Sequence, residues 1–282
     1  MKFGLTYFPS AEAIHPGDLG RAAEERGFES VWFAEHSHIP VSPATPGPPA
    51  PGEPGLPAAY YQTADPFVAL AMAAQATERL LVATGICLVA QRDVFQTAKQ
   101  VASLDQLSGG RFLFGVGGGW NQPEVENHGT PFAKRFAVLR ERIEAMKAIW
   151  SEERAEYHGE HVDFDEMYAW PKPIQQPHPP VHVGGAGPRA IRRALRYGDG
   201  WVPLMGSGED DPIELMPDVR KALSEAGRDE DGFQVSIYMC PPLADTVSRC
   251  AHAGIDRVLF PLPSVPHDEA LKVLDTYAAL IA

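Results

Sequence analysis

The chain has 282 residues, 44% hydrophobic and 22% charged, a composition typical of a folded globular protein that excludes disorder, collagen and coiled coil. A formal net charge of -13 argues against nucleic acid as a partner, because binding through phosphates needs a basic surface. No apolar stretch reaches the roughly 18 residues of a membrane helix, and the opening MKFGLTYF lacks the features of a signal peptide. We therefore expect a cytoplasmic protein with no membrane partner.

The first elements in chain order are a strand from Lys2 to Phe8, a helix from Asp18 to Gly27 and a strand from Ser30 to Ala34. Residues 40–66, Pro40 to Pro66, follow, and their PVSPATPGPPAPGEPG run can form neither a helix nor a central strand. A linker between domains is disfavoured, because too few residues precede it to form a domain. We interpret this segment as an insertion that is either disordered or functional.

From Asp65 onward, strand and helix patterns alternate, and a small hairpin, EYHGEHVDF, interrupts them once. The later strand patterns are Leu80 to Ile86, Arg111 to Val116, Val181 to Val183, Gly200 to Leu204, Gln234 to Met239 and Arg257 to Leu262. The helix patterns are Asp65 to Thr77, Val94 to Leu107, Ala133 to Trp150, the stretch after Gly187, Pro212 to Ala226, Leu243 to Ala253 and His267 to Ile281. About eight strands, each followed by a helix, favour one closed (β/α)8 TIM barrel over residues 1–282 rather than an open doubly wound sheet. Its active site should then lie at the carboxyl ends of the strands.

A glycine-rich segment, GGAGPR, directly follows one strand pattern and opens a helix. Free NH groups at a helix start bind anions, and glycines allow a phosphate to approach the backbone closely. Arginines recur in the helix, either as a solvated face or within reach of an anionic ligand. A dinucleotide fingerprint is disfavoured, because that motif belongs to the first strand and helix of a Rossmann fold. We predict a phosphate site, rather than a simple tight turn, at Gly184, Gly185, Ala186, Gly187, Pro188 and Arg189.

A second glycine cluster, in FGVGGGWNQPE, ends another strand but gives no sign of opening a helix. It predicts either a tight bend or a loop where a flat group approaches the backbone. Gly118, Gly119, Trp120 and Asn121 are then the expected contacts.

The second strand ends in WFAEHSHIP, which places Glu35, His36 and His38 at the predicted catalytic rim. The HxH pair is also found in metal-dependent barrel hydrolases, but such sites need further ligands at later strand ends. No such ligands are convincingly placed, so a metal site is disfavoured.

Six segments are informative when they are taken together: WFAEHSHIP, DPFVALAMAAQAT, LLVATGICLVAQRD, AKQVASLDQLSGGRFLFGVGGGWN, WPKPIQ and VHVGGAGPRAIRRALRYGDGW. In this order they resemble the luciferase-like monooxygenase superfamily. The resemblance is greatest to its coenzyme F420-dependent oxidoreductases from actinobacteria. It implies a (β/α)8 barrel with a deazaflavin at its mouth. Glu35 and His36 would contact the ring system, with His36 as a proton donor or acceptor. The segment Thr84, Gly85 and Ile86 would lie behind the ring, with a non-proline cis peptide at Gly85 to Ile86.

The resemblance predicts hydride transfer between F420 and an unidentified small molecule. FMN-dependent monooxygenation, or cofactor binding without turnover, remains an alternative. In sugar-phosphate dehydrogenases of this branch a glutamate soon follows the glycines after the fourth strand, and this chain has none at that position. Oxidation of glucose 6-phosphate is therefore doubtful. Glu124 lies nearby, but it is at least as readily interpreted as a surface acid. The insertion should form a lid carrying Tyr60 and Tyr61. Dimers are common in the family, so we expect a homodimer.

Overall fold

A computed structural model of the protein describes residues 1–41, 55–206 and 210–281. Eight parallel strands close into a barrel in the order β1-β10-β9-β8-β7-β4-β3-β2, which confirms the predicted (β/α)8 fold. The strands are β1 (Lys2–Tyr7), β2 (Ser30–Phe33), β3 (Leu81–Thr84), β4 (Phe112–Val116), β7 (Val181–Gly184), β8 (Gly200–Val202), β9 (Gln234–Ile237) and β10 (Arg257–Pro261).

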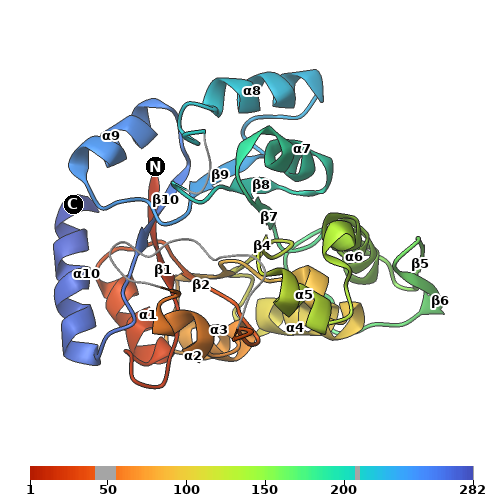
Figure 1. Ribbon diagram of the computed structural model, residues 1–282, viewed down its shortest axis with the longest axis horizontal. Helices are drawn as coiled ribbons and strands as arrows, with labels where there is room; N and C mark the ends of the chain where they lie inside the picture. Colours follow the sequence, from red (N-terminus) through yellow and green to blue (C-terminus); the bar gives the residue numbers. More distant parts are fainter. Residues whose placement is uncertain (42–54, 207–209, 282) are drawn as a thin grey trace.

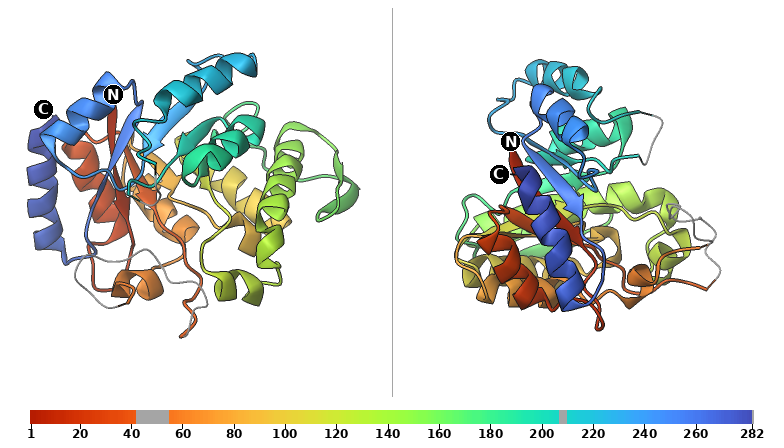
Figure 2. Two further views of the ribbon diagram at one scale, coloured as in Figure 1. Left: turned by 45° about the horizontal axis from the view of Figure 1, so that its top comes forward. Right: turned by 90° about the vertical axis from the view of Figure 1, so that its left-hand side faces the viewer.

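Helices surround the strands on the outside of the barrel (Figure 1, Figure 2). They are α1 (Pro16–Glu25), α2 (Ala58–Gln62), α3 (Pro66–Gln75), α4 (Val94–Leu107), α5 (Gln122–Asn127), α6 (Arg135–Ser151), α7 (Gly187–Tyr197), α8 (Met216–Glu225), α9 (Ala244–His252) and α10 (His267–Ile281), with 3-10 turns η1 (Val89–Gln91) and η2 (Phe132–Lys134). None of those described is both long enough and apolar enough to span a bilayer.

Two short helices were not expected from the sequence. Helix α2 lies within the predicted insertion, of which residues 42–54 lie outside the described part of the chain. Helix α5 begins directly after the second glycine cluster, so the expectation that no helix opens there is wrong. Asn121 caps it by accepting a hydrogen bond from the backbone NH of Glu124.

The predicted hairpin is confirmed as β5 (Ala155–His158) paired antiparallel with β6 (Asp163–Met167). It projects from the molecule beyond α6 (Figure 1). It therefore takes no part in the barrel.

The barrel interior is partly polar. Trp32 fills its centre with Leu113, Val202 and Leu259. The guanidinium of Arg257, only 1% exposed, pairs with Glu29 and bonds to neighbouring polar side chains. These large buried groups give the mouth of the barrel a solid floor.

Candidate functional site at the barrel mouth

The carboxyl ends of the strands meet at one end of the barrel, as the parallel topology requires. The segments that follow β2, β3, β4 and β7 all start there. Every segment that the sequence predicted to contact a ligand therefore begins at the same mouth.

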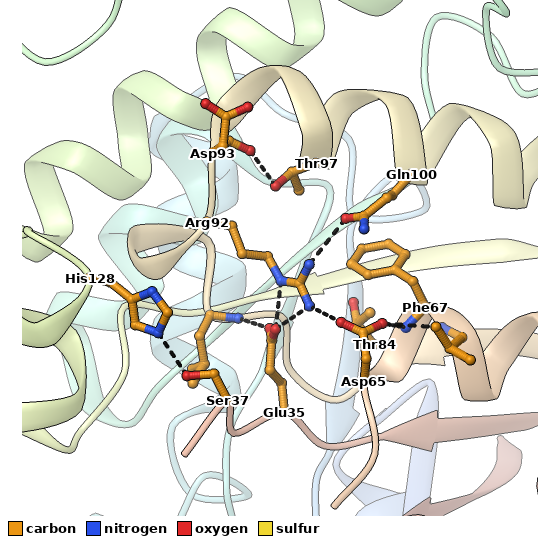
Figure 3. Close-up of polar contacts among 12 residues, drawn as sticks. Glu35, Ser37, Asp65, Phe67, Thr84, Arg92, Asp93, Thr97, Gln100 and His128 are labelled. Atoms are coloured by element: carbon orange, nitrogen blue, oxygen red, sulfur yellow. Dashed lines mark hydrogen bonds and ion pairs between the residues drawn. The ribbon is translucent and has the colours of Figure 1, made fainter. Parts of the chain in front are cut away.

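Glu35, expected to be catalytic, is buried and held by an arginine that the sequence analysis did not single out. One carboxylate oxygen accepts the backbone NH of Leu88 at 2.6 Å, and the other accepts Nε of Arg92 at 2.5 Å. Arg92 also pairs with Asp65 at 2.7 Å and donates to Gln100 at 3.0 Å (Figure 3). Both oxygens of Glu35 are occupied within the protein, so this residue joins the end of β2 to the segment after β3.

His36 is oriented by Glu124. Nδ1 of His36 lies 2.8 Å from Oε2 of Glu124, and the backbone NH of Ser37 donates to Oε1 at 3.1 Å. The side chains of His36 and Glu124 are 6% and 1% exposed. The interpretation of Glu124 as a surface acid is wrong, because α5 turns its first residues back toward the end of β2. One sequence signal could have indicated that Glu124 lies at the start of a helix: it follows Asn121, a residue that often caps helices, by three positions.

Aromatic rings surround the imidazole of His36. The ring centroid of Tyr60 lies 5.4 Å from that of His36 and 4.7 Å from that of Phe8. Trp120 stands edge-on to His36 at 5.6 Å. Burial raises the pKa of the Tyr60 hydroxyl. Of the two tyrosines expected in the lid, the structure brings Tyr60 to the site, whereas Tyr61 is 59% exposed.

The Gly85–Ile86 peptide bond is cis, as the resemblance predicted. The carbonyl of Gly85 accepts a hydrogen bond from the hydroxyl of Tyr238 at 2.5 Å. Desolvation raises the pKa of that hydroxyl, so it stays a donor. Thr84 is fully buried and donates its hydroxyl to the carbonyl of Gly115 inside the barrel wall. No local sequence pattern around Tyr238 indicates this contact.

Several of the predicted glycines make room for neighbouring side chains. A Cβ on Gly117 would lie 2.0 Å from Cδ1 of Ile86, and one on Gly184 would lie 2.9 Å from the same atom. A Cβ on Gly118 would come within 2.9 Å of Phe136. A larger residue at any of these positions would therefore force Ile86 or Phe136 to move. Gly119 has a φ of +77°, so a turn requires it there.

The remaining glycines form a loop beside two arginines. Gly185 and Gly187 have φ values of +117° and +70° and lead into α7. The guanidinium carbon of Arg193 lies 4.0 Å from the ring centroid of Phe136, and that of Arg135 lies 4.2 Å from it. Neither guanidinium forms an ion pair among the described residues, and Nε of Arg193 is buried without a partner. We call the loop Gly185–Gly187 with Arg135 and Arg193 the anion clamp.

The other predicted phosphate contacts lie at the start of α7. Ala186 is its N-cap and provides no side-chain cap, and Pro188 occupies the first turn, where its missing NH costs nothing. Arg189 is exposed. Burial and the neighbouring Arg193 lower the pKa of Arg135. A phosphate bound here would relieve that repulsion and use the free NH groups of the helix.

The two histidines of the HxH pair do not converge. His38 bonds to the hydroxyl of Ser37 at 2.9 Å and to the amide of Asn127 at 2.9 Å. Among residues 1–41, 55–206 and 210–281, no group of three or more His, Cys, Asp or Glu side chains is arranged to hold a metal ion.

Comparison with known proteins identifies the family. A sequence profile of the luciferase-like monooxygenases matches residues 11–270. The chain belongs to the luciferase-like monooxygenase family. An uncharacterized member from Mycobacterium tuberculosis is 40% identical over 285 residues, covering 100% of this chain and 99% of the relative.

Two further similar proteins are named as a dehydrogenase and as a monooxygenase. The F420-dependent glucose-6-phosphate dehydrogenase of Kineococcus radiotolerans is 32% identical over 233 residues, or 80% of this chain and 64% of that protein. Among solved structures, the monooxygenase RslO1 from Streptomyces bottropensis superposes with a TM-score of 0.81 at 22% identity, covering 100% and 98% of the two chains. The chain thus has an F420-dependent dehydrogenase among its relatives, and it shares its fold with a protein named a monooxygenase.

Proposed function

We propose that the chain is a coenzyme F420-dependent oxidoreductase that transfers a hydride between the deazaflavin and a small organic substrate. The observation that carries the proposal is the buried His36–Glu124 pair, which lies at the same barrel mouth as the anion clamp. The relative from Kineococcus supports the choice of cofactor, because its name states dependence on F420.

The residues present fit a phosphate-bearing cofactor. The anion clamp offers backbone NH groups and two arginines that form no ion pair within residues 1–41, 55–206 and 210–281, in a chain that is otherwise strongly acidic. Gly85, Ile86 and Trp120 would line the ring system. When bound, the deazaflavin supplies a carbon that accepts or donates a hydride.

His36 handles the proton that must accompany hydride transfer to or from an alcohol or double bond. A carboxylate only accepts hydrogen bonds, so Nδ1 carries the hydrogen shared with Glu124. This leaves Nε2 of His36 to take or give the proton, and histidine is the residue most often used for this task. Glu124 is a positioning residue that fixes the orientation and tautomer of the ring.

Glu35 also acts as a positioning residue in this proposal, rather than as a catalytic one. Arg92 and the NH of Leu88 each bind one of its oxygens, and the residue is only 8% exposed, which fits a role in holding the backbone rather than in contacting a substrate. Its contribution is to hold the end of β2, and so the backbone of His36, in place. Tyr60 and Trp120 exclude water from the imidazole.

FMN is the second cofactor to consider, because an anion clamp accepts its phosphate equally well and the structural neighbour RslO1 is named a monooxygenase. Cofactor binding without turnover is a third outcome.

The deciding experiment is a fluorescence titration of apoprotein with F420 and, separately, with FMN. We expect micromolar or tighter binding of F420, followed by hydride transfer to at least one alcohol or enone in a substrate screen. Preference for FMN would overturn the deazaflavin assignment, and tight F420 binding with no hydride transfer would indicate a binding protein.

A further inference from the structure

Aromatic side chains from α2 and from two strand ends meet beside His36. The ring centroid of Tyr60, on α2, lies 4.7 Å from that of Phe8, which follows β1, and 6.4 Å from that of Trp120, which follows β4. We call Phe8, Tyr60 and Trp120 the aromatic wall. Each of the three residues is only partly buried, so apolar ring surface stays in contact with water at the barrel mouth. Apolar surface left open beside a candidate catalytic group is typical of a ligand site.

Contacts with the barrel hold Tyr60 in this place. The backbone NH of Ala64 donates to the carbonyl of Pro9 at 2.7 Å, which joins the segment after α2 to the end of β1. Asp65 then caps α3 and pairs with Arg92 at 2.7 Å. The chain directly after α2 is therefore anchored, and the aromatic wall is a fixed part of the mouth.

A cavity of about 330 Å³ borders His36, a size suited to a small ligand. Its charged lining residues, Glu35, Asp65 and Arg92, are already paired with one another (Figure 3). Two carboxylates and one guanidinium leave an excess of negative charge, which disfavours an anionic ligand. Burial, together with the nearby His38, lowers the pKa of His128, which keeps it uncharged near neutral pH. The remaining lining is uncharged as well: Ser37, Thr63, Pro66 and Gln91.

The aromatic wall and the cavity together describe a ligand that His36 could act on. The wall favours a flat unsaturated group, because the faces and edges of aromatic rings attract one another. The cavity favours an uncharged molecule that carries a polar oxygen. We propose that the substrate is an uncharged aromatic ketone, or the corresponding secondary alcohol, whose ring packs on the aromatic wall. The inference rests on the proposed function and adds the substrate class to it.

The reaction of such a ketone uses the groups already described. In the direction of reduction, the carbonyl carbon receives a hydride from the reduced deazaflavin, and the π bond of the carbonyl group breaks. The oxygen takes a proton from Nε2 of His36, so that an alcohol forms, the imidazole becomes neutral and the deazaflavin is oxidised by two electrons. A carbonyl conjugated to a ring lies in the plane of that ring, so the wall that binds the ring also orients the carbonyl.

The test measures binding of ketones by calorimetry to protein loaded with oxidised F420, which cannot reduce a ketone, so no turnover occurs. The probes are acetophenone, the straight-chain methyl ketone with the same number of carbon atoms, and acetophenone with a carboxylate on its ring. The test variants are Tyr60→Ala, which removes the ring, and Tyr60→Phe, which keeps it. The matched control is Tyr61→Ala, at the neighbouring tyrosine that is 59% exposed. Thermal unfolding of each variant checks that the fold is kept.

We expect the wild-type protein to bind acetophenone about three to ten times more tightly than the straight-chain ketone, as expected for an aromatic contact. The carboxylated probe should bind more weakly than acetophenone. Tyr60→Ala should lose the preference for acetophenone, whereas Tyr60→Phe and Tyr61→Ala should keep it.

Three results would overturn the inference: equal binding of the two uncharged ketones by the wild-type protein, tighter binding of the carboxylated probe, or an unchanged preference in Tyr60→Ala. F420-dependent turnover of a different substrate would then leave the proposed function standing. Failure of F420 to bind would overturn the proposed function and the inference with it.

Discussion

His36 and Glu124 lie 88 residues apart in the chain and are joined by a hydrogen bond of 2.8 Å. The bond connects the loop after β2 to α5, the helix that follows β4. An imidazole fixed at Nδ1 by a buried carboxylate presents one nitrogen in one orientation, which general acid or base catalysis requires. This relationship is the centre of the proposed mechanism.

Replacing either partner should separate catalysis from cofactor binding. His36→Ala should lower turnover at least about tenfold, since it removes the group that exchanges the proton. Glu124→Gln should lower turnover by less, because an amide still contacts Nδ1 but cannot hold the same tautomer through charge. Steady-state rates with a substrate from the screen, and F420 dissociation constants, measure both effects. Unchanged turnover in His36→Ala would remove His36 from the mechanism.

The fold could be predicted from the sequence because barrel strands and helices are local patterns. The cis peptide at Gly85–Ile86 followed from family resemblance. Long-range pairings could not be predicted: Arg92 meets Glu35 across 57 residues, and nothing in either local sequence indicates it. Glu124 was misinterpreted because its burial depends on how α5 folds back on the barrel. The space at Gly184 likewise depends on a distant residue, because a Cβ there would lie 2.9 Å from Cδ1 of Ile86 in the segment after β3.

Removing an arginine of the anion clamp should weaken cofactor binding. Arg193→Ala should raise the dissociation constant of F420 or FMN by about tenfold or more, because a hydrogen bond to a charged group is worth roughly 1.5–3 kcal/mol. The matched control is Arg154→Ala on the projecting hairpin, where the side chain is 57% exposed. Titrations of the three proteins provide the comparison. Equal affinities would place the cofactor phosphate elsewhere.

The Glu35–Arg92 pair should contribute mainly to stability. Arg92→Ala leaves the buried carboxylate of Glu35 without its cation, and breaking a buried pair from one side typically costs about 3–5 kcal/mol. Arg21→Ala, which breaks the exposed pair with Asp18, should cost about 1 kcal/mol or less. Urea denaturation measures both. Equal losses would contradict a structural role for the buried pair.

His182 should make the protein sensitive to acid. It is fully buried, and neither ring nitrogen has a hydrogen-bond partner in the described part of the chain. Desolvation together with Arg257 lowers its pKa to about 3. The unfolded chain binds this proton below a pH of about 6.5, whereas the folded protein does not, so stability falls as the pH drops below that value. The loss of folding free energy approaches roughly 1.4 kcal/mol for each pH unit. We expect His182→Leu to lose less stability than wild type between pH 7 and pH 5.5, above the range where most carboxylates titrate. Parallel denaturation curves for the two proteins would refute this origin.

The exposed face of α3 and α4 should form a homodimer interface. Val68 on α3 is 64% exposed and Leu107 on α4 is 83% exposed, and the two helices pack side by side. Helix α3 is apolar on nearly all sides, which is unusual for a helix that faces water. Exposed apolar side chains on neighbouring helices are typical of an association surface, and a second copy of the same chain is the commonest partner. Val68→Glu with Leu107→Glu should convert a dimer into a monomer when mass is measured by light scattering. Leu243→Glu, at a leucine that is 59% exposed before α9, is the control and should leave the dimer intact. A wild-type protein that is monomeric at micromolar concentration would contradict the proposal.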